Sequence, residues 1–587
     1  MLLGRGSPWP ALVQAAPKNA KDCEIVASGI IIVLAIFARY SHFAILTMAL
    51  EEQLRLIELE IDSAYRTNPL LGLNGPTALW NLLTYIEMAS WSDAQGFDAG
   101  DYFPSYVVEE YLRPLAYPAY WLLIGCVPTG RLDTEYDEGR DAAARDLMIL
   151  AREYRTFTAV FTYWSRRLAQ LDISGREVVV THNLADEAAY EAYNRLVPTR
   201  GVEGVDEAAD RWKVLPFSTM FGRLTINRDR FFTKLKPKLI RAVVGASEPM
   251  LRAVFTLPKE WKFSRYSLQD YKAVWSSLSA LAKLHLLARH MAARAGCDRA
   301  GRRDAVLVMS PDELFMRVAR YSRVAISTVN EIVVDLTYGA RGIERPQPFL
   351  QPLFRCGDAY MIMPTLVLSS SPERNLTALL NKLPDERRVY MQLTQDKEQH
   401  MRDQLETELV QRNYRTWHGF VPGRSDLPDV DLAIISDCEK LCILTQLKWF
   451  IDPAEVREVI ERSKELEKGV LQARAIYSTF QAGHAALLTE LQVDAEYQAF
   501  PLVISANWIG HGALQDPMVP IIEASHFREK VRRSATLAEV VAWLAQRDYL
   551  PTCGKHYEVM DSPATVAGWT VHWYAIGLLS KGRVRPV

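Results

Sequence analysis

The order of hydrophobic and polar residues predicts helices over residues 51–300. Apolar residues recur at every third and fourth position in the segments 51–65, 141–171 and 269–295. This spacing puts the apolar side chains on one face of a helix, where they can pack against other helices. Stretches rich in Pro and Gly separate the segments, for example NPLLGLNGP at 68–76. We therefore expect a helical region over these residues.

Residues 1–50 contain an apolar run at 25–38, followed by Arg39 and a second apolar stretch up to Leu50. The run is shorter than the roughly 20 residues that a membrane-spanning helix needs. No clear signal-peptide cleavage site follows it. We expect buried helices here, and a membrane anchor is the alternative.

Two short helices separated by a turn are predicted within residues 310–338. Ser310 and Glu313 have the spacing of a capping box, and Pro311 stands at the first helical position. A break follows near Arg323, and Ser327 is expected to cap the second helix.

This helix pair resembles a helix-turn-helix, and the alternating residues after it fit the hairpin of a winged-helix unit. Residues 301–384 are therefore expected to be a winged-helix-like connector, with plain helix packing as the alternative. In the DNA-binding case, three arginines would contact phosphates: Arg317, Arg320 and Arg323.

From about residue 385 the pattern changes to helix, strand, strand, strand, helix, strand. An α/β domain over residues 385–587 is expected, with a mixed sheet flanked by helices on both sides. The predicted helices are 394–413 and 452–480, and the predicted strands are 414–420, 428–436, 440–450 and 499–510. A helix at 535–549 and an alternating segment at 568–578 complete the domain.

Length and composition describe a folded protein of several domains. The 587 residues predict three or four domains at about 150 residues each. The net charge of -2 provides no overall basic field, so any nucleic-acid binding must come from a local patch. The 7 cysteines contain no CxxC pair, which is typical of reduced thiols in a cytoplasmic protein and gives no zinc-site spacing.

Asp431, Gln446 and Lys448 are the candidate catalytic residues. Gln446 and Lys448 are two apart on one predicted strand, so their side chains share a face about 6–7 Å apart. Asp431 lies on the neighbouring predicted strand. Oxygen ligands bind Mg²⁺, and a lysine can hold an attacking water or offset phosphate charge. The alternative is a structural role, in which Lys448 keeps a strand edge from pairing with another chain and Asp431 caps a turn. Charged residues within apolar runs need partners, however, and this favours a site.

Residues 396–512 resemble the PD-(D/E)XK nuclease superfamily, and more closely its QxK branch, which includes the Mrr-type restriction enzymes. The resemblance rests on Asp431, on Gln446 and Lys448, on Trp449 after them, and on the order of the elements. It implies that Asp431 and Gln446 hold a metal ion and that Lys448 orients the nucleophilic water.

The resemblance also implies an acid from the first helix and a phosphate contact from the helix after the third strand. For the acid, Glu406 is preferred, with Glu408 and Asp403 as alternatives. For the phosphate contact, Lys468 and Gln472 are the candidates, and an ordinary solvated helix face is the alternative.

Two features depart from the family pattern. Gln446 stands where most members have Glu or Asp, so the site carries one negative charge fewer. The literal Pro-Asp pair is Pro428 and Asp429, whereas the strand register favours Asp431.

The expected function is that of a Mg²⁺-dependent DNA endonuclease, with Mn²⁺ as a substitute, acting in restriction, antiviral defence or DNA repair. The helical region would bind a protein partner or a second copy of the chain, and no membrane contact is expected. The alternative is a catalytically degenerate module that binds nucleic acid or serves as a scaffold.

Overall fold

The structure is a computed structural model. It describes residues 50–93, 111–182, 184–197, 223–255, 257–297, 301–421, 423, 425, 427–450 and 456–579. The apolar run at 25–38 lies outside these residues, so the expectation of buried helices there stays a prediction. None of the described helices combines the length and the apolar character that crossing a bilayer requires. The described chain combines helices with several sheets, as expected for a multidomain α/β protein.

Helices form the main part of the first half, as the periodicity predicts. Asp137 caps α5 (Glu138–Ser165), and Ser267 with Asp270 forms a capping box at the start of α10 (Leu268–Arg294). The apolar stripes of these helices lie in buried clusters with their neighbours. The other helices of this part are α2 (Gly75–Asp93), α4 (Ala116–Gly125), α6 (Leu184–Leu196) and α9 (Pro237–Val254).

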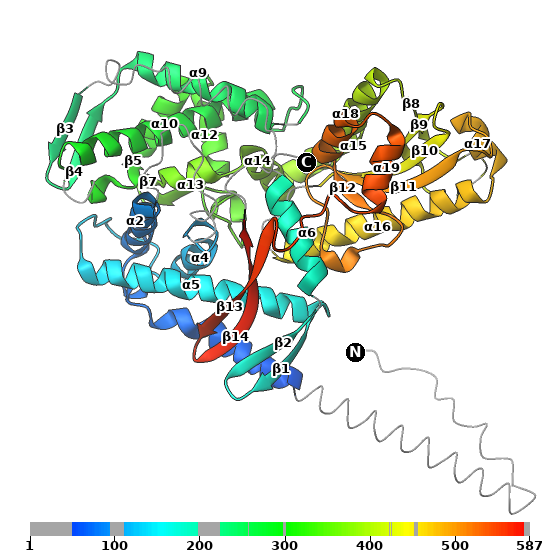
Figure 1. Cartoon of the computed structure of the whole chain (residues 1–587). Helices are drawn as coiled ribbons and strands as arrows, with labels where there is room; N and C mark the ends of the chain where they lie inside the picture. Colours follow the sequence, from blue (N-terminus) through cyan, green and yellow to red (C-terminus); the bar gives the residue numbers. More distant parts are fainter. Residues whose placement is uncertain are drawn as a thin grey trace, which may run out of the picture.

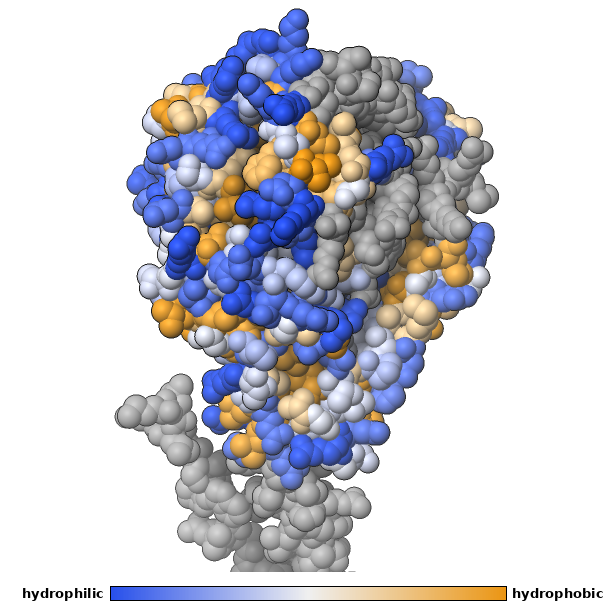
Figure 2. All heavy atoms as spheres, turned by 90° about the vertical axis from the view of Figure 1, so that its left-hand side faces the viewer, coloured by the Kyte–Doolittle hydropathy of each residue, from blue (hydrophilic) through white to orange (hydrophobic). Residues whose placement is uncertain are grey.

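Two β-hairpins interrupt the region that was expected to be helical. One consists of β1 (Gln170–Ser174) and β2 (Glu177–Thr181), and the other of β3 (Arg223–Asn227) and β4 (Arg230–Lys234). Figure 2 views the molecule from the side on which β3 and β4 lie, and this surface carries both hydrophilic and hydrophobic residues. Each strand has only 5 residues, which is too short to give a clear period-2 signal beside long helices.

The segment expected to be a winged-helix-like connector contains the predicted helix pair. Ser310 caps α11 (Pro311–Ser322) by accepting a hydrogen bond from Glu313 N. The prediction that Ser327 caps the second helix is wrong, because Ala325 is the N-cap residue of α12 (Ile326–Asp335) and Ser327 is already the second residue of the helix. A three-stranded sheet accompanies the pair: β5 (Leu307–Met309), β6 (Leu353–Cys356) and β7 (Ala359–Ile362).

The predicted order of helix, three strands, helix and strand is confirmed in the C-terminal third. β10 pairs antiparallel with β9 and parallel with β11, so the five-stranded sheet is mixed. Its order is β12-β11-β10-β9-β8. The elements are α15 (Pro384–Gln411), β8 (Arg415–Gly419), β9 (Val430–Ser436), β10 (Leu441–Lys448), α16 (Val456–Gln481), β11 (Gln498–Ser505) and β12 (Ile521–Glu523).

Helices cover both faces of this sheet (Figure 1). Alternate residues of β9 divide between two apolar clusters, because successive side chains of a strand point to opposite faces. Leu432 and Ile434 cluster with residues of α15, and Ala433 and Ile435 cluster with residues of α16. Two short helices, α13 (Pro364–Ser369) and α14 (Pro372–Lys382), precede α15.

The last hairpin leaves the five-stranded sheet and joins the first half of the chain. β14 (Trp569–Leu578) pairs antiparallel with β13 (Tyr557–Val566) and parallel with β2, which gives a second sheet of order β1-β2-β14-β13. In Figure 1 the red hairpin β13–β14 lies beside the cyan strands β1 and β2. The helices before it, α18 (Ala524–Arg533) and α19 (Leu537–Ala545), stay with the five-stranded sheet.

Candidate functional site

Side-chain hydrogen bonds join β9 and β10 at the point where their backbone ladder stops. The last backbone pair of the two strands is Leu432 with Thr445. Beyond it, Leu447 N donates to Asp431 Oδ2 at 2.8 Å, and Gln446 Nε2 donates to the carbonyl oxygen of Asp429 at 2.7 Å. The two predicted site residues are therefore held in fixed positions at the same edge of the sheet.

Asp431 lies in a half-buried and negatively charged position. Burial is the largest cause that raises its pKa to about 6, and the carboxylates of Asp429 and Glu398 add to this effect. The Leu447 N–H and the Lys448 ammonium act in the opposite direction. A carboxylate with this balance of charges favours a bound cation, because a cation stabilises its ionised form.

The acid from α15 that interacts with Asp431 is Glu398. The expected Glu406 instead lies 3.0 Å from His418 Nδ1 on β8. Of the two alternatives, Glu408 pairs with arginines on α18, and Asp403 is exposed. The structure therefore brings Asp431, Gln446 and Lys448 together, and Glu398, an exposed residue two turns before Glu406, is the acid of α15 whose charge reaches Asp431.

The residue before Glu398 is a buried lysine that no sequence pattern singles out. Lys397 is 3% exposed, and its Nζ lies 3.6 Å from the ring centroid of Trp449, the residue that follows Lys448. The same Nζ donates to Tyr390 Oη at 2.6 Å, and the ring of Trp261 lies 5.4 Å away. Burial lowers the pKa of Lys397 to about 6.

The helix α16 lies directly against Lys448. A Cβ atom added to Gly469 would lie 2.9 Å from Lys448 Cε, so glycine is the residue that leaves room for this side chain. Lys468, next to it, is exposed. Gln472, one turn later, has a buried Oε1 with no hydrogen-bond partner among the described residues.

The arginines of the helix-turn-helix lie in a different unit from the five-stranded sheet. Arg317 forms an ion pair with Glu313 one turn earlier on α11. Arg320 near the end of α11 and Arg323 in the turn are both exposed. The structure therefore does not bring these residues to the site of Asp431.

Asp431 and Gln446 supply the two oxygen atoms that could hold a metal ion at this position. No group of three or more His, Cys, Asp or Glu side chains within the described ranges has the geometry of a metal site. Mg²⁺ commonly takes one or two protein ligands, with water and substrate phosphate completing its octahedron. Gln446 uses its amide nitrogen for Asp429, which leaves its amide oxygen for a cation beside the Asp431 carboxylate.

Comparisons with known proteins were made for the whole chain. No protein-family model, curated protein or solved structure matches it. Glu398 and Lys397 are the functional candidates that the sequence patterns missed. No sequence pattern distinguishes Glu398 from the other acids of its helix, and nothing in the sequence marks Lys397 as buried.

Proposed function

We propose that the chain is a Mg²⁺-dependent DNA endonuclease with a PD-(D/E)XK-type domain of the QxK branch in its C-terminal third. The observation that carries the proposal is the fixed set of Asp431, Gln446 and Lys448 at the edge of two adjoining strands. The helix, three strands, helix and strand around it have the order that the resemblance implies.

Each residue has a role that follows from its chemistry. Asp431 and the amide oxygen of Gln446 would hold Mg²⁺, with Mn²⁺ as a substitute. The metal ion, when bound, offsets charge on the scissile phosphate and lowers the pKa of a coordinated water. The Lys448 ammonium would orient the attacking water and stabilise the charge that develops on the phosphate oxygens. Glu398 would act through a water rather than as a direct ligand.

The experiment is a cleavage assay on the full chain. Linear, circular and single-stranded DNA would be incubated with Mg²⁺ or Mn²⁺, with wild type, Asp431→Ala and Lys448→Ala compared. The matched control is Lys440→Ala, which removes a lysine at the far end of the same hairpin, where it pairs with Asp494. Cleavage by wild type and Lys440→Ala alone supports the proposal. Equal behaviour of all four proteins contradicts it.

The second candidate is a module that has kept the fold and lost catalysis. The hydrogen bond from Gln446 Nε2 to Asp429 favours it, because an amide can tie two strands together without any metal ion. Calorimetric titration separates the two candidates. A divalent ion that binds wild type and not Asp431→Asn supports the enzyme, and no binding at millimolar metal supports the scaffold.

DNA is the proposed substrate, and restriction, defence against foreign DNA and repair are the proposed settings. Because the net charge is -2, the whole protein has no positive field that would attract DNA, which is a polyanion. DNA must therefore be recognised by local groups. Lys468 and Gln472 lie on α16, the helix against which Lys448 packs, and they are the proposed phosphate contacts at the site itself.

A further inference from the structure

The unit around α11 and α12 has the connectivity of a winged helix. Its elements follow in the order α10, β5, α11, α12, β6 and β7, and β7 lies between β5 and β6 in the sheet. β6 and β7 form a hairpin with a two-residue turn, in which Gly357 has a φ of 57°. Both α11 and α12 pack against α10.

The turn between α11 and α12 is that of a helix-turn-helix. Three residues connect the helices, and the first of them, Arg323, has a φ of 61°. A connection of three or four residues with a left-handed residue is typical of this motif. On the inner side of α12, Val329, Ile332 and Val333 are fully buried in the shared core.

The outer side of α12 carries polar residues in its N-terminal half, beside the exposed apolar Ile326. Ser327 is exposed, and Thr328 and Asn330 are half-buried. Hydroxyl and amide groups at the N-terminal part of the second helix are the groups that read base edges in the major groove.

The charges of this unit are arranged so that its surface arginines remain available. The two acids of α12 are neutralised from within the protein, because Asp335 lies 3.2 Å from Arg265 and 2.9 Å from Arg341, and Glu331 pairs with the same arginines. The exposed arginines of α11, the turn and the wing have no acidic partner in the described part of the chain: Arg320, Arg323 and Arg355.

We propose that residues 268–362 are a winged-helix unit that binds double-stranded DNA, with α12 in the major groove. Arg320 and Arg323 contact phosphates beside the groove, and Arg355 contacts a phosphate from the wing. The inference rests on the proposed function, in which DNA is the substrate, and it adds that this DNA is double-stranded. Recognition and cleavage then belong to two separate units of one chain.

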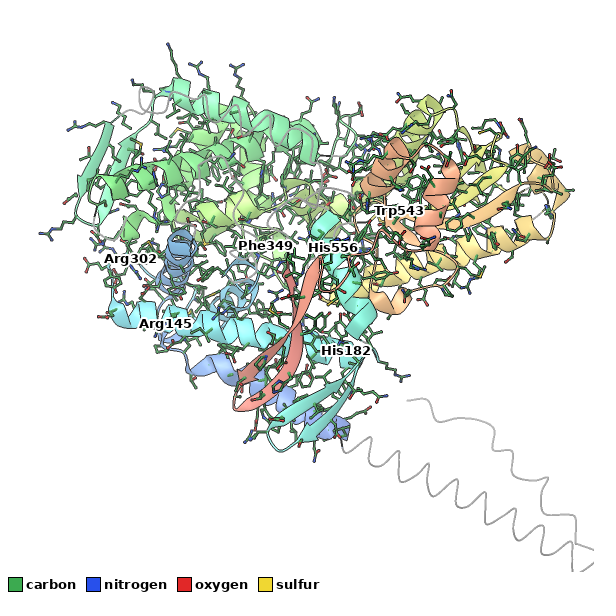
Figure 3. All side chains as sticks on the ribbon, viewed as in Figure 1. Arg145, His182, Arg302, Phe349, Trp543 and His556 are labelled. Carbon is green, nitrogen blue, oxygen red and sulfur yellow. The ribbon has the colours of Figure 1, made fainter. Side chains whose placement is uncertain are left out.

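The experiment measures binding without cleavage. Full-length Lys448→Ala in EDTA would be titrated into a short fluorescent duplex, and into one of its strands alone, with anisotropy as the signal. Duplex affinity should exceed single-strand affinity. Adding Arg320→Gln and Arg323→Gln should weaken duplex binding by about tenfold or more and reduce the slope of log affinity against log salt by about 2. The matched control is Arg145→Gln, an exposed arginine of α5 that is labelled in Figure 3.

Two results would overturn the inference. One is an unchanged duplex affinity and salt slope in the arginine variant, and the other is equal affinity for the duplex and the single strand. The outcome is independent of catalysis, because metal and Lys448 are both absent from the assay. If arginine-dependent duplex binding is found while wild type fails to cleave DNA with Mg²⁺, only the proposed function is lost.

Discussion

Asp431 shows how a single residue of this site carries a cost in stability. Its carboxyl group is half-buried next to two other acids, and these surroundings raise its pKa to about 6, from an unfolded value near 4. The folded state therefore binds a proton more tightly than the unfolded state. The stability from this proton is fully present below about pH 4 and is lost as the pH rises to about 6. A bound cation would offset the loss.

Asp431→Asn should therefore stabilise the metal-free protein. Asn has the shape of the carboxyl group and does not ionise, so the free energy of unfolding at neutral pH should rise by about 2–3 kcal/mol. The difference from wild type should shrink as the pH falls from about 6 to about 4. Denaturant unfolding at several pH values measures it. Millimolar Mg²⁺ should stabilise wild type and leave the variant unchanged, and equal stabilisation of both would contradict Asp431 as a ligand.

Lys397 is a basic residue, unlike Asp431, and its burial also lowers the stability of the folded protein. Its pKa is lowered to about 6 by burial, so between about pH 6 and pH 10 the unfolded state binds the extra proton and stability rises with pH. Lys397→Met keeps the length of the side chain and removes this cost. The lowered pKa predicts a gain in stability of about 4–5 kcal/mol at neutral pH for the variant, less what the lost hydrogen bond to Tyr390 contributes, with the gain fading toward pH 10. A loss of stability at neutral pH would show that the hydrogen bond to Tyr390 and the packing of Lys397 on the Trp449 ring outweigh the cost of its burial.

At the scale of elements, the order of the strands decides which part of α15 reaches the site. The C-terminal end of α15 leads into β8, whose first residue, Arg415, pairs with Ile435 at the far end of β9 from Asp431. An acid near Asp431 must therefore come from an earlier turn of α15, and Glu406 already lies at that end of β8, because its partner His418 precedes the pair of Gly419 with Val430. Periodicity in the sequence predicted the four longer strands of this sheet, β8 to β11, and missed the three-residue strand β12. It did not show that Glu406 would pair with His418 and Glu408 with arginines of α18, which leaves Glu398 as the acid of α15 whose charge reaches Asp431.

The contact between α16 and β10 gives a prediction at the same scale. Gly469→Ala would place a Cβ where the end of the Lys448 side chain lies, so that flexible end must move. Replacing a helical Gly by Ala favours the folded state by about 0.5–1 kcal/mol. We therefore expect unchanged or slightly higher stability together with at least a tenfold loss of kcat, at nearly constant KM, in the DNA cleavage assay.

The matched control is Gly245→Ala on α9, where an added Cβ meets nothing within 4 Å. It should show the gain in stability without the loss of kcat. Full activity of Gly469→Ala would mean that the position of the Lys448 ammonium does not limit the reaction.

At the scale of the whole molecule, the hairpin near the end of the chain completes a sheet that begins at β1. The alternation in residues 568–578 predicted a strand, but a strand pattern does not name its partner. The partner, β2, lies almost 400 residues earlier in the chain, and the pairing of Val571 with Val178 fixes the register. The sequence therefore indicated the element and left the arrangement of the units open.

A buried polar network joins these units. Glu187 on α6 accepts hydrogen bonds from Tyr163 Oη on α5 and from His511 Nε2, at 2.7 Å, in the segment after β11. His182, labelled in Figure 3, stacks on Trp573 of β14 with ring centroids 4.5 Å apart. Glu187 is 5% exposed, and burial raises its pKa. The network thus links the first half of the chain, the five-stranded sheet and the last hairpin.

Glu187→Ala should weaken the attachment between the units. It leaves His511 and Tyr163 buried without their shared acceptor, and breaking such a buried pair costs about 3 kcal/mol or more. The matched control is Glu313→Ala, which removes a surface carboxylate paired one turn away and should cost about 1 kcal/mol or less. Denaturant unfolding, followed by tryptophan fluorescence and by circular dichroism, measures both. We expect Glu187→Ala to unfold at lower denaturant, with the two signals no longer coincident, because the units then unfold separately. A loss no larger than that of the control, with coincident signals, would show that the apolar contacts alone hold the units together.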